Sequence, residues 1–232
     1  MKLAIMQPYF FPYIGYFKLL HAVEKFVFYD DVNFIKGGWI NRNRLLLGGK
    51  AGYFTVPLSQ AGSFSKINSI QIKSDMPWEA RILAQISGAY SKAPYYDPVI
   101  SLVKNVLETH DGRISTIAKN SVLKVAEYLS LKKSFTMSSE VYGNQEKKSV
   151  ARVLDICRQE SATSYVNLPG GRDLYAEEDF LKAGIHLEFV SVRMPIYRQS
   201  IAGFHPGLSI IDVLMFNSPQ QVVSMMADEG EQ

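Results

Sequence analysis

The sequence is poor in the residues that mark disulfide-rich and metal-binding proteins. It has one cysteine, Cys157, and four histidines in 232 residues. A single cysteine excludes an internal disulfide framework and a zinc site made only of cysteines, and it is typical of a reducing, cytoplasmic setting. Because no run of about 18 apolar residues occurs, we expect no membrane-spanning helix. We also expect no signal peptide, because Gln7 and Pro8 interrupt the first apolar run and no small-residue cleavage site follows.

Neither a strong charge bias nor a familiar catalytic motif is present. The 25 basic and 22 acidic residues leave a net charge of +3, which is too small to predict nucleic-acid binding. The sequence contains no G-x-x-x-x-G-K-[ST] loop, no G-x-G-x-x-G after a strand and no G-x-S-x-G. It has no His-Glu metal motif either. We therefore assign no metal site, and the cofactor is left unknown.

What is there is ordinary globular composition, with 47% hydrophobic and 20% charged residues. We expect one domain over residues 1–232, built as an α/β fold with a parallel-sheet core. Apolar runs at Lys2–Met6 and 26–29 flank a helical pattern that starts near Pro12, and this predicts two parallel strands joined by a helix. The other expected elements are a loop with short ordered pieces over 33–50, strands at 53–58, 67–72, 165–167 and 186–192, helices at 149–160, 177–183 and 209–215, and a frayed tail after Ala227. Helices at 78–92, 98–108 and 114–129 form an inserted helical block over about 77–130.

The first candidate site follows the first expected strand. Residues 7–16 open a helix, and ligands of parallel sheets bind beyond the carboxyl ends of strands, near helix N-termini. Gly15 would let a ligand approach the backbone closely. The alternative is a proline-rich turn packed with aromatic side chains.

Two further candidates lie between residues 30 and 44. Asp30 and Asp31 end the second strand, and in an extended segment they point to opposite faces, so at most one meets a given ligand. Arg42 and Arg44 lie on one side if their segment is extended, and arginine forks bind phosphate or carboxylate. The alternatives are loop capping by the aspartates and a solvated basic loop.

The fourth candidate lies near the C-terminus. His205 could act as a general acid or base, although a lone histidine is more often structural. Ser209 could cap the helix that carries Asp212. Cys157 falls on the apolar face of a helix, which indicates a core residue and not a nucleophile.

Several motifs occur together in an order that resembles the WbqC-like family, and the resemblance covers nearly the whole chain. They are Gln7-Pro-Tyr-Phe-Phe-Pro-Tyr-Ile-Gly-Tyr16, Asp30-Asp-Val-Asn-Phe34, Trp39-Ile-Asn-Arg-Asn-Arg44, Phe54-Thr-Val-Pro57, Tyr197-Arg-Gln199 and Leu208-Ser-Ile-Ile-Asp212. The family is associated with bacterial O-antigen and other surface-polysaccharide gene clusters. The resemblance implies a cytoplasmic role in making a sugar precursor, such as transfer of an aminoacyl or acyl group to a nucleotide-linked amino sugar.

A second resemblance concerns the fold. Tyr13-Ile-Gly-Tyr16 looks like the HIGH signature of class I synthetases and nucleotidylyltransferases, with both histidines replaced by tyrosine. It implies a nucleotidylyltransferase-like (HUP-like) sheet. Tyrosine cannot carry the positive charge of those histidines, and no Lys-Met-Ser-Lys-Ser-like loop is present, so the sequence does not favour adenylyl transfer.

Three functional hypotheses follow: a transferase acting on a nucleotide-sugar, a non-catalytic scaffold of a polysaccharide pathway, and an ATP-dependent amino-acid activating enzyme. For the transferase we expect a small-molecule substrate and no nucleic acid, and a homo-oligomer is left open. Its proton acceptor is Asp31 or His205. The expected substrate-binding residues are Gln7, Tyr9, Tyr13, Gly15, Tyr16, Asp30, Asn33, Trp39, Asn41, Arg42, Arg44, Tyr197, Gln199, Ser209 and Asp212. The hypothesis requires the segments near positions 9, 31, 42 and 205 to meet around one cavity.

Overall fold

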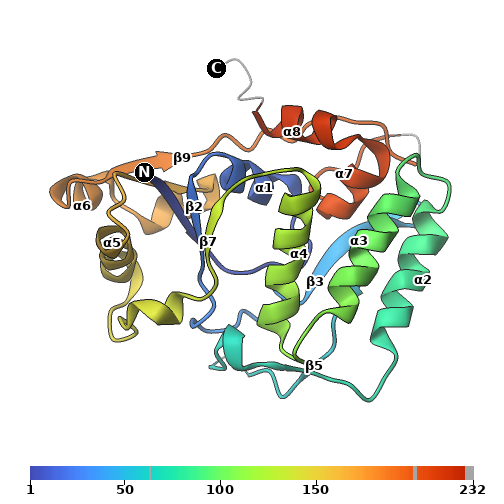
Figure 1. Cartoon of the computed structure of the whole chain (residues 1–232), viewed down its shortest axis with the longest axis horizontal. Helices are drawn as coiled ribbons and strands as arrows, with labels where there is room; N and C mark the ends of the chain where they lie inside the picture. The colour runs from blue at the N-terminus through green and yellow to red at the C-terminus, as the bar shows by residue number, and fades with distance from the viewer. Residues whose placement is uncertain (63, 201–202, 228–232) are drawn as a thin grey trace.

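The fold is centred on a sheet of five parallel strands, as expected for an α/β protein (Figure 1). A computed structural model describes residues 1–62, 64–200 and 203–227, so the fraying expected after Ala227 concerns residues outside the described part. The strands are β1 (Lys2–Met6), β2 (Lys25–Phe28), β7 (Ser134–Thr136), β8 (Ser164–Asn167) and β9 (His186–Phe189). The parallel pairing of β1 with β2 confirms the strand–helix–strand unit predicted at the N-terminus.

The order of these strands identifies the edge of the sheet at which a ligand is expected. Across the sheet the order is β7-β2-β1-β8-β9. Numbered among themselves, the strands therefore run 3-2-1-4-5, as in doubly wound α/β folds. In such folds the chain order reverses between the first and fourth strands, here β1 and β8, and ligands bind beyond the carboxyl ends of the strands there. The closer likeness to nucleotidylyltransferases stays a prediction.

Alternating side chains of the strands give the sheet two apolar faces. Leu3, Ile5 and Val27 belong to one cluster of buried residues, with α5 (Ser149–Gln159) and α6 (Glu177–Lys182). Ala4 and Phe26 belong to a larger cluster on the other face, with α1 (Ile14–His21) and α4 (Ile114–Tyr128). Helices cover both faces, as a parallel sheet requires.

The helical block consists of α2 (Trp78–Tyr90), α3 (Tyr96–Glu108) and α4, close to the predicted ranges. Ile82 of α2, Val103 of α3 and Val122 of α4 are fully or almost fully buried in the same cluster as Phe26 of the sheet. The block thus extends the main core and does not enclose one of its own. At the end of the chain α7 (Ile210–Phe216) is followed by α8 (Pro219–Ala227), which the sequence analysis did not predict.

Residues 33–50, expected as a loop with short ordered pieces, contain a regular six-residue strand in their second half. Arg42–Leu47 forms β3, which pairs antiparallel with β4 (Lys50–Thr55). Gly48 and Gly49 connect the strands with φ angles of +57° and +81°, which glycine adopts without steric strain in a two-residue hairpin turn.

The remaining elements are short. The strand expected at 67–72 is mostly a 3₁₀ helix, η1 (Ile67–Ser69), followed by β6 (Gln71–Ile72), which pairs with β5 (Leu58–Ser59). Two more 3₁₀ helices are η2 (Ser139–Tyr142) and η3 (Pro169–Leu174). In the described part of the chain, no helix combines the length and the apolar character needed to cross a bilayer.

Cys157 is fully buried in α5, and burial raises the pKa of its thiol to about 12. Because the thiolate is the reactive form, we expect Ellman's reagent to leave the native protein unmodified at mildly alkaline pH. The same protein unfolded in concentrated guanidinium chloride should react with one equivalent. Stoichiometric reaction of the native protein within minutes would contradict the buried position.

Candidate functional site

The segment that follows β1 is anchored through the backbone of Phe11. Phe11 has a φ of +42°, a conformation that costs a non-glycine residue about 1–3 kcal/mol. Its N–H donates to Ser121 Oγ of α4 at 2.8 Å, and its carbonyl accepts from Asn43 Nδ2 at 2.9 Å and from Ser209 Oγ at 2.7 Å. Three buried side chains from distant parts of the sequence therefore fix the position of this segment, which follows the carboxyl end of β1.

Beside this anchor lies a cavity of about 280 Å³, which we call the Arg44 pocket. Its residues Tyr9, Pro12 and Tyr13 follow the carboxyl end of β1, one of the two strands between which the strand order reverses. Three of its walls are aromatic, which suits a planar or sugar ring. Its lining residues are Tyr9, Pro12, Tyr13, Trp39, Asn43, Arg44, Met194 and Gly207.

Arg44 lines this pocket, and one of its hydrogen-bond donors is buried without a partner among the described residues. Its guanidinium lies 5.5 Å from the centroid of the Trp39 ring, and Nη2 donates to the carbonyl of Gly207 at 3.2 Å. Nε is buried, and no acceptor for it exists among the described residues. Buried N–H groups are nearly always paired in folded proteins, so the free donor of a permanent cation points to an anionic group as the missing partner.

Arg42 lies on the same face of β3, but its Nε and Nη2 are both hydrogen-bonded to backbone carbonyls. Its Nε donates to the carbonyl of Gly38 at 3.2 Å, Nη2 donates to Gly37, and the guanidinium stacks 4.4 Å from the centroid of Tyr53. The segment is thus extended and places both arginines on one face, as predicted, but only Arg44 lines the pocket.

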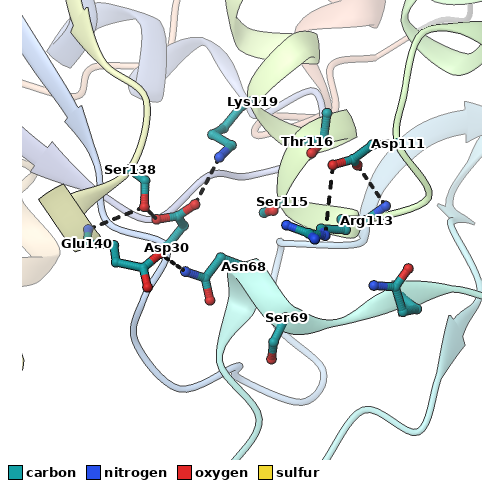
Figure 2. A pocket seen from close by; sticks show the side chains of 11 residues that line it. Asp30, Asn68, Ser69, Asp111, Arg113, Ser115, Thr116, Lys119, Ser138 and Glu140 are labelled. Atoms are coloured by element: carbon teal, nitrogen blue, oxygen red, sulfur yellow. Dashed lines mark hydrogen bonds and ion pairs between the residues drawn. The ribbon is translucent and has the colours of Figure 1, made fainter.

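A second cavity, the Asp30 pocket, opens beyond the carboxyl ends of β2 and β7 (Figure 2). Its volume is about 550 Å³. Asp30 is fully buried, and its carboxylate accepts from Lys119 Nζ at 2.9 Å and from Ser138 Oγ at 2.5 Å. The lining residues are Asp30, Asn68, Ser69, Gln71, Asp111, Arg113, Ser115, Thr116, Lys119, Ser138 and Glu140.

Asp31 faces away from both pockets and forms a buried ion pair. One carboxylate oxygen accepts from Arg152 Nη2 and the other from Ser139 Oγ. Asp31 and Arg152 are 5% and 4% exposed, and Arg152 lies over the ring of Tyr29. With both oxygens occupied and no lining of either pocket, Asp31 fits a structural role better than the predicted role of proton acceptor.

The C-terminal candidates form a buried network around Asp212. Its carboxylate accepts hydrogen bonds from the hydroxyls of Tyr90 at 2.7 Å and Tyr197 at 2.6 Å, and from Gln199 Nε2 at 3.1 Å. Burial, which is the largest influence, raises the pKa of Asp212 and also the pKa of Tyr90 and Tyr197. Gln199 also binds the backbone N–H and carbonyl of His205. The network therefore fixes the loop that carries the 205–207 segment.

Gly15 and Tyr16 contribute to packing. A Cβ on Gly15 would lie 2.3 Å from the ring of Tyr13 and 2.6 Å from Val192, so glycine admits the Tyr13 ring there, where a close ligand was expected. Tyr16 is fully buried, and its hydroxyl donates to the carbonyl of Gln7 at 2.9 Å. Neither Tyr16 nor Gln7 lines the Arg44 pocket or the Asp30 pocket.

The predicted asparagines hold loops in place. Asn33 Oδ1 accepts from Lys66 Nζ at 3.0 Å, and Asn41 Nδ2 donates to the carbonyl of Val56 at 2.9 Å. Ser209 caps α7 by accepting from the N–H of Ile211, as the sequence predicted.

The transferase hypothesis requires the segments near positions 9, 31, 42 and 205 to share one cavity, and three of these four segments do so. Tyr9, Arg44 and Gly207 represent the segments near 9, 42 and 205 in one pocket, while Asp31 lies apart. The sequence analysis did not single out Asn43, although it lies within the Trp39–Arg44 motif, and it did not single out Ser115 or Lys119, whose importance depends on how α4 packs.

Comparison with known proteins gives a family but no activity. A family model described as "WbqC-like protein family" matches residues 7–224. An uncharacterized protein of Mycobacterium tuberculosis (strain ATCC 25618 / H37Rv), Rv1507c, is 28% identical over 218 residues, which cover 93% of each chain. No solved structure matches the chain significantly.

Proposed function

Because the chain belongs to the WbqC-like protein family, we propose that it is a cytoplasmic transferase in the biosynthesis of bacterial surface-polysaccharide precursors. Its substrate is a nucleotide-linked amino sugar, and the group transferred is an aminoacyl or acyl group. The observation that carries the proposal is Arg44, a permanent cation whose Nε is buried without an acceptor among the described residues and which lines a pocket walled by aromatic rings. A phosphate attached to a ring would satisfy both features.

The size of the Arg44 pocket limits what it can hold. About 280 Å³ lies at the lower end of small-molecule sites, so the pocket suits one ring with its attached phosphate and not an entire nucleotide-sugar. Tyr9 and Trp39 provide stacking surfaces, and Arg44 provides charge-assisted hydrogen bonds. The rest of the substrate would extend from the open side of the pocket.

The proposed transfer is an amide-forming step. The amine nitrogen of the sugar bonds to the acyl carbon of the donor while the bond from that carbon to the leaving group breaks. The leaving group departs with the bonding electron pair, and a base takes the proton that the nitrogen loses.

His205 remains the candidate for that base. Its side chain has no hydrogen bond to any described residue, and it interacts electrostatically with the carboxylate of Asp212. His205 is two residues from Gly207, which lines the Arg44 pocket. An imidazole whose nitrogens make no hydrogen bond to the described part of the protein can take a proton from an amine.

We expect Arg44→Met to weaken binding of the preferred nucleotide or nucleotide-sugar by about tenfold to a hundredfold, the usual value of hydrogen bonds to a charged group. Calorimetry with a panel of nucleotides, nucleotide-sugars and acyl donors identifies the ligand. Mass spectrometry of the nucleotide-sugar after incubation with each donor then detects the added group.

Arg42→Met is the matched control, because Arg42 lies two residues away on the same face, has its Nε bonded to a backbone carbonyl and does not line the pocket. We expect its affinity to stay within about threefold of the wild type. No binding by any member of the panel would defeat the proposal and favour a scaffold. If the protein exchanges pyrophosphate into ATP in the presence of an amino acid, the transferase proposal would give way to the amino-acid activating enzyme.

A further inference from the structure

The Asp30 pocket has an interior made of polar side chains, and among its buried lining residues the hydrogen bonds leave one group free. Asp30 is bound to Lys119 and Ser138, and Glu140 accepts from Asn68 at 3.3 Å. None of the eleven lining residues is aromatic or aliphatic. A polar cavity of about 550 Å³ at the carboxyl edge of a parallel sheet is placed and sized as a ligand site.

The free group is the hydroxyl of Ser115 in the first turn of α4. Ser115 is only 2% exposed and lines the pocket (Figure 2), yet its hydroxyl makes no hydrogen bond to any residue in the described ranges. The hydroxyl oxygen is not among the solvent-shielded atoms without a partner, and because Ser115 lines the cavity, a partner for the hydroxyl would lie there. A hydroxyl can both donate and accept, so the partner need not be charged.

The charges of the pocket disfavour an anion. Three carboxylates, on Asp30, Asp111 and Glu140, oppose two cations, Arg113 and Lys119. Asp111 accepts from the N–H of Arg113 at 3.0 Å and from the side chain of Thr116. Its carboxylate already occupies the place that a phosphate would take at the N-terminus of α4. A further anion would meet uncompensated negative charge.

We propose that the Asp30 pocket is a second binding site, which takes an uncharged or amine-bearing polyhydroxylated ring, that is, a hexose or hexosamine. Sugar hydroxyls donate to carboxylates and accept from ammonium, guanidinium and serine groups, so one ring satisfies donors and acceptors at once. The site stands on residues distinct from those of the Arg44 pocket. It holds whether or not the proposed acyl transfer takes place.

The test is NMR titration of the full chain with free hexoses and hexosamines, including glucose, galactose, glucosamine and galactosamine, at millimolar concentrations. At least one sugar should shift the backbone amide signals of Ser115 and Thr116. Ser115→Ala should weaken that binding about fivefold or more, the value of about one hydrogen bond, while the thermal midpoint stays unchanged.

A control variant separates this site from other causes. Ser101→Ala removes an exposed serine of α3 whose hydroxyl donates within its own helix. It should bind the sugar as the wild type does. The proposal is overturned if no sugar shifts the Ser115 signals, if Ser115→Ala binds with unchanged affinity, or if inorganic phosphate displaces the sugar.

Discussion

Replacing Arg152 by methionine should lower the free energy of unfolding by about 3–5 kcal/mol. Removing one partner of a buried ion pair leaves the other charge without compensation, and this is more costly than the pair is worth. Asp31 is 5% exposed, and its remaining partner would be the hydroxyl of Ser139. Equilibrium unfolding in urea, followed by circular dichroism, measures the loss.

Two control proteins show whether burial causes the loss. The double variant Asp31→Leu with Arg152→Met removes both charges and should recover most of the stability, because an apolar pair of similar volume is often as stable as a buried ion pair. Lys182→Met breaks an exposed pair with Glu178 on α6 and should change stability by less than about 0.5 kcal/mol. A loss below about 1 kcal/mol in Arg152→Met would mean that Asp31 finds water or another donor.

The two aspartates also mark how far sequence reasoning reaches. Their opposite orientation follows from the local geometry of an extended segment, and the structure has Asp30 in a pocket and Asp31 against α5. Their partners do not follow from local geometry. Lys119 is 89 residues from Asp30, and Arg152 is 121 residues from Asp31. Which cation meets which carboxylate depends on how α4 and α5 pack.

The errors in the predicted fold have a similar cause. The sheet core was predictable because buried parallel strands are short apolar runs bounded by turn residues. The hairpin of β3 and β4 was missed because its first residues, 42–44, are polar and give no alternating apolar pattern. Their strand geometry depends on the cross-strand partner, Thr55 for Arg42 and Tyr53 for Arg44. That pairing is also what presents Arg44 to the pocket.

We expect Asp212→Ala to lower the free energy of unfolding by about 3 kcal/mol, the second-largest effect. The change removes the acceptor shared by Tyr90, Tyr197 and Gln199 and leaves their buried donors unsatisfied, each at a cost of about 1–3 kcal/mol that relaxation of the structure partly relieves. Urea unfolding measures this loss as well.

The loss should also depend on pH, with a sign that follows from the raised pKa of Asp212. The folded carboxyl binds its proton more tightly than the unfolded one, whose pKa is near the ordinary 3.8. Its contribution to stability is therefore fully present below that value and declines as the pH rises through the raised pKa. Asp212→Ala lacks this decline, so the difference between wild type and variant should shrink from acidic to neutral pH. A difference that grows with pH would contradict the assignment.

The two variants separate stability from ligand binding. Arg152 is buried at α5 and lines neither pocket, so Arg152→Met, studied where it remains folded, should bind the ligand of the Arg44 pocket as the wild type does. Asp212 holds Gln199, and Gln199 holds the backbone of His205, next to the Gly207 carbonyl that Arg44 contacts. Asp212→Ala should therefore weaken binding of that ligand by about tenfold, even where the protein is fully folded. If both variants bind equally well, the Asp212 network supports only the core and does not position the 205–207 segment for the site.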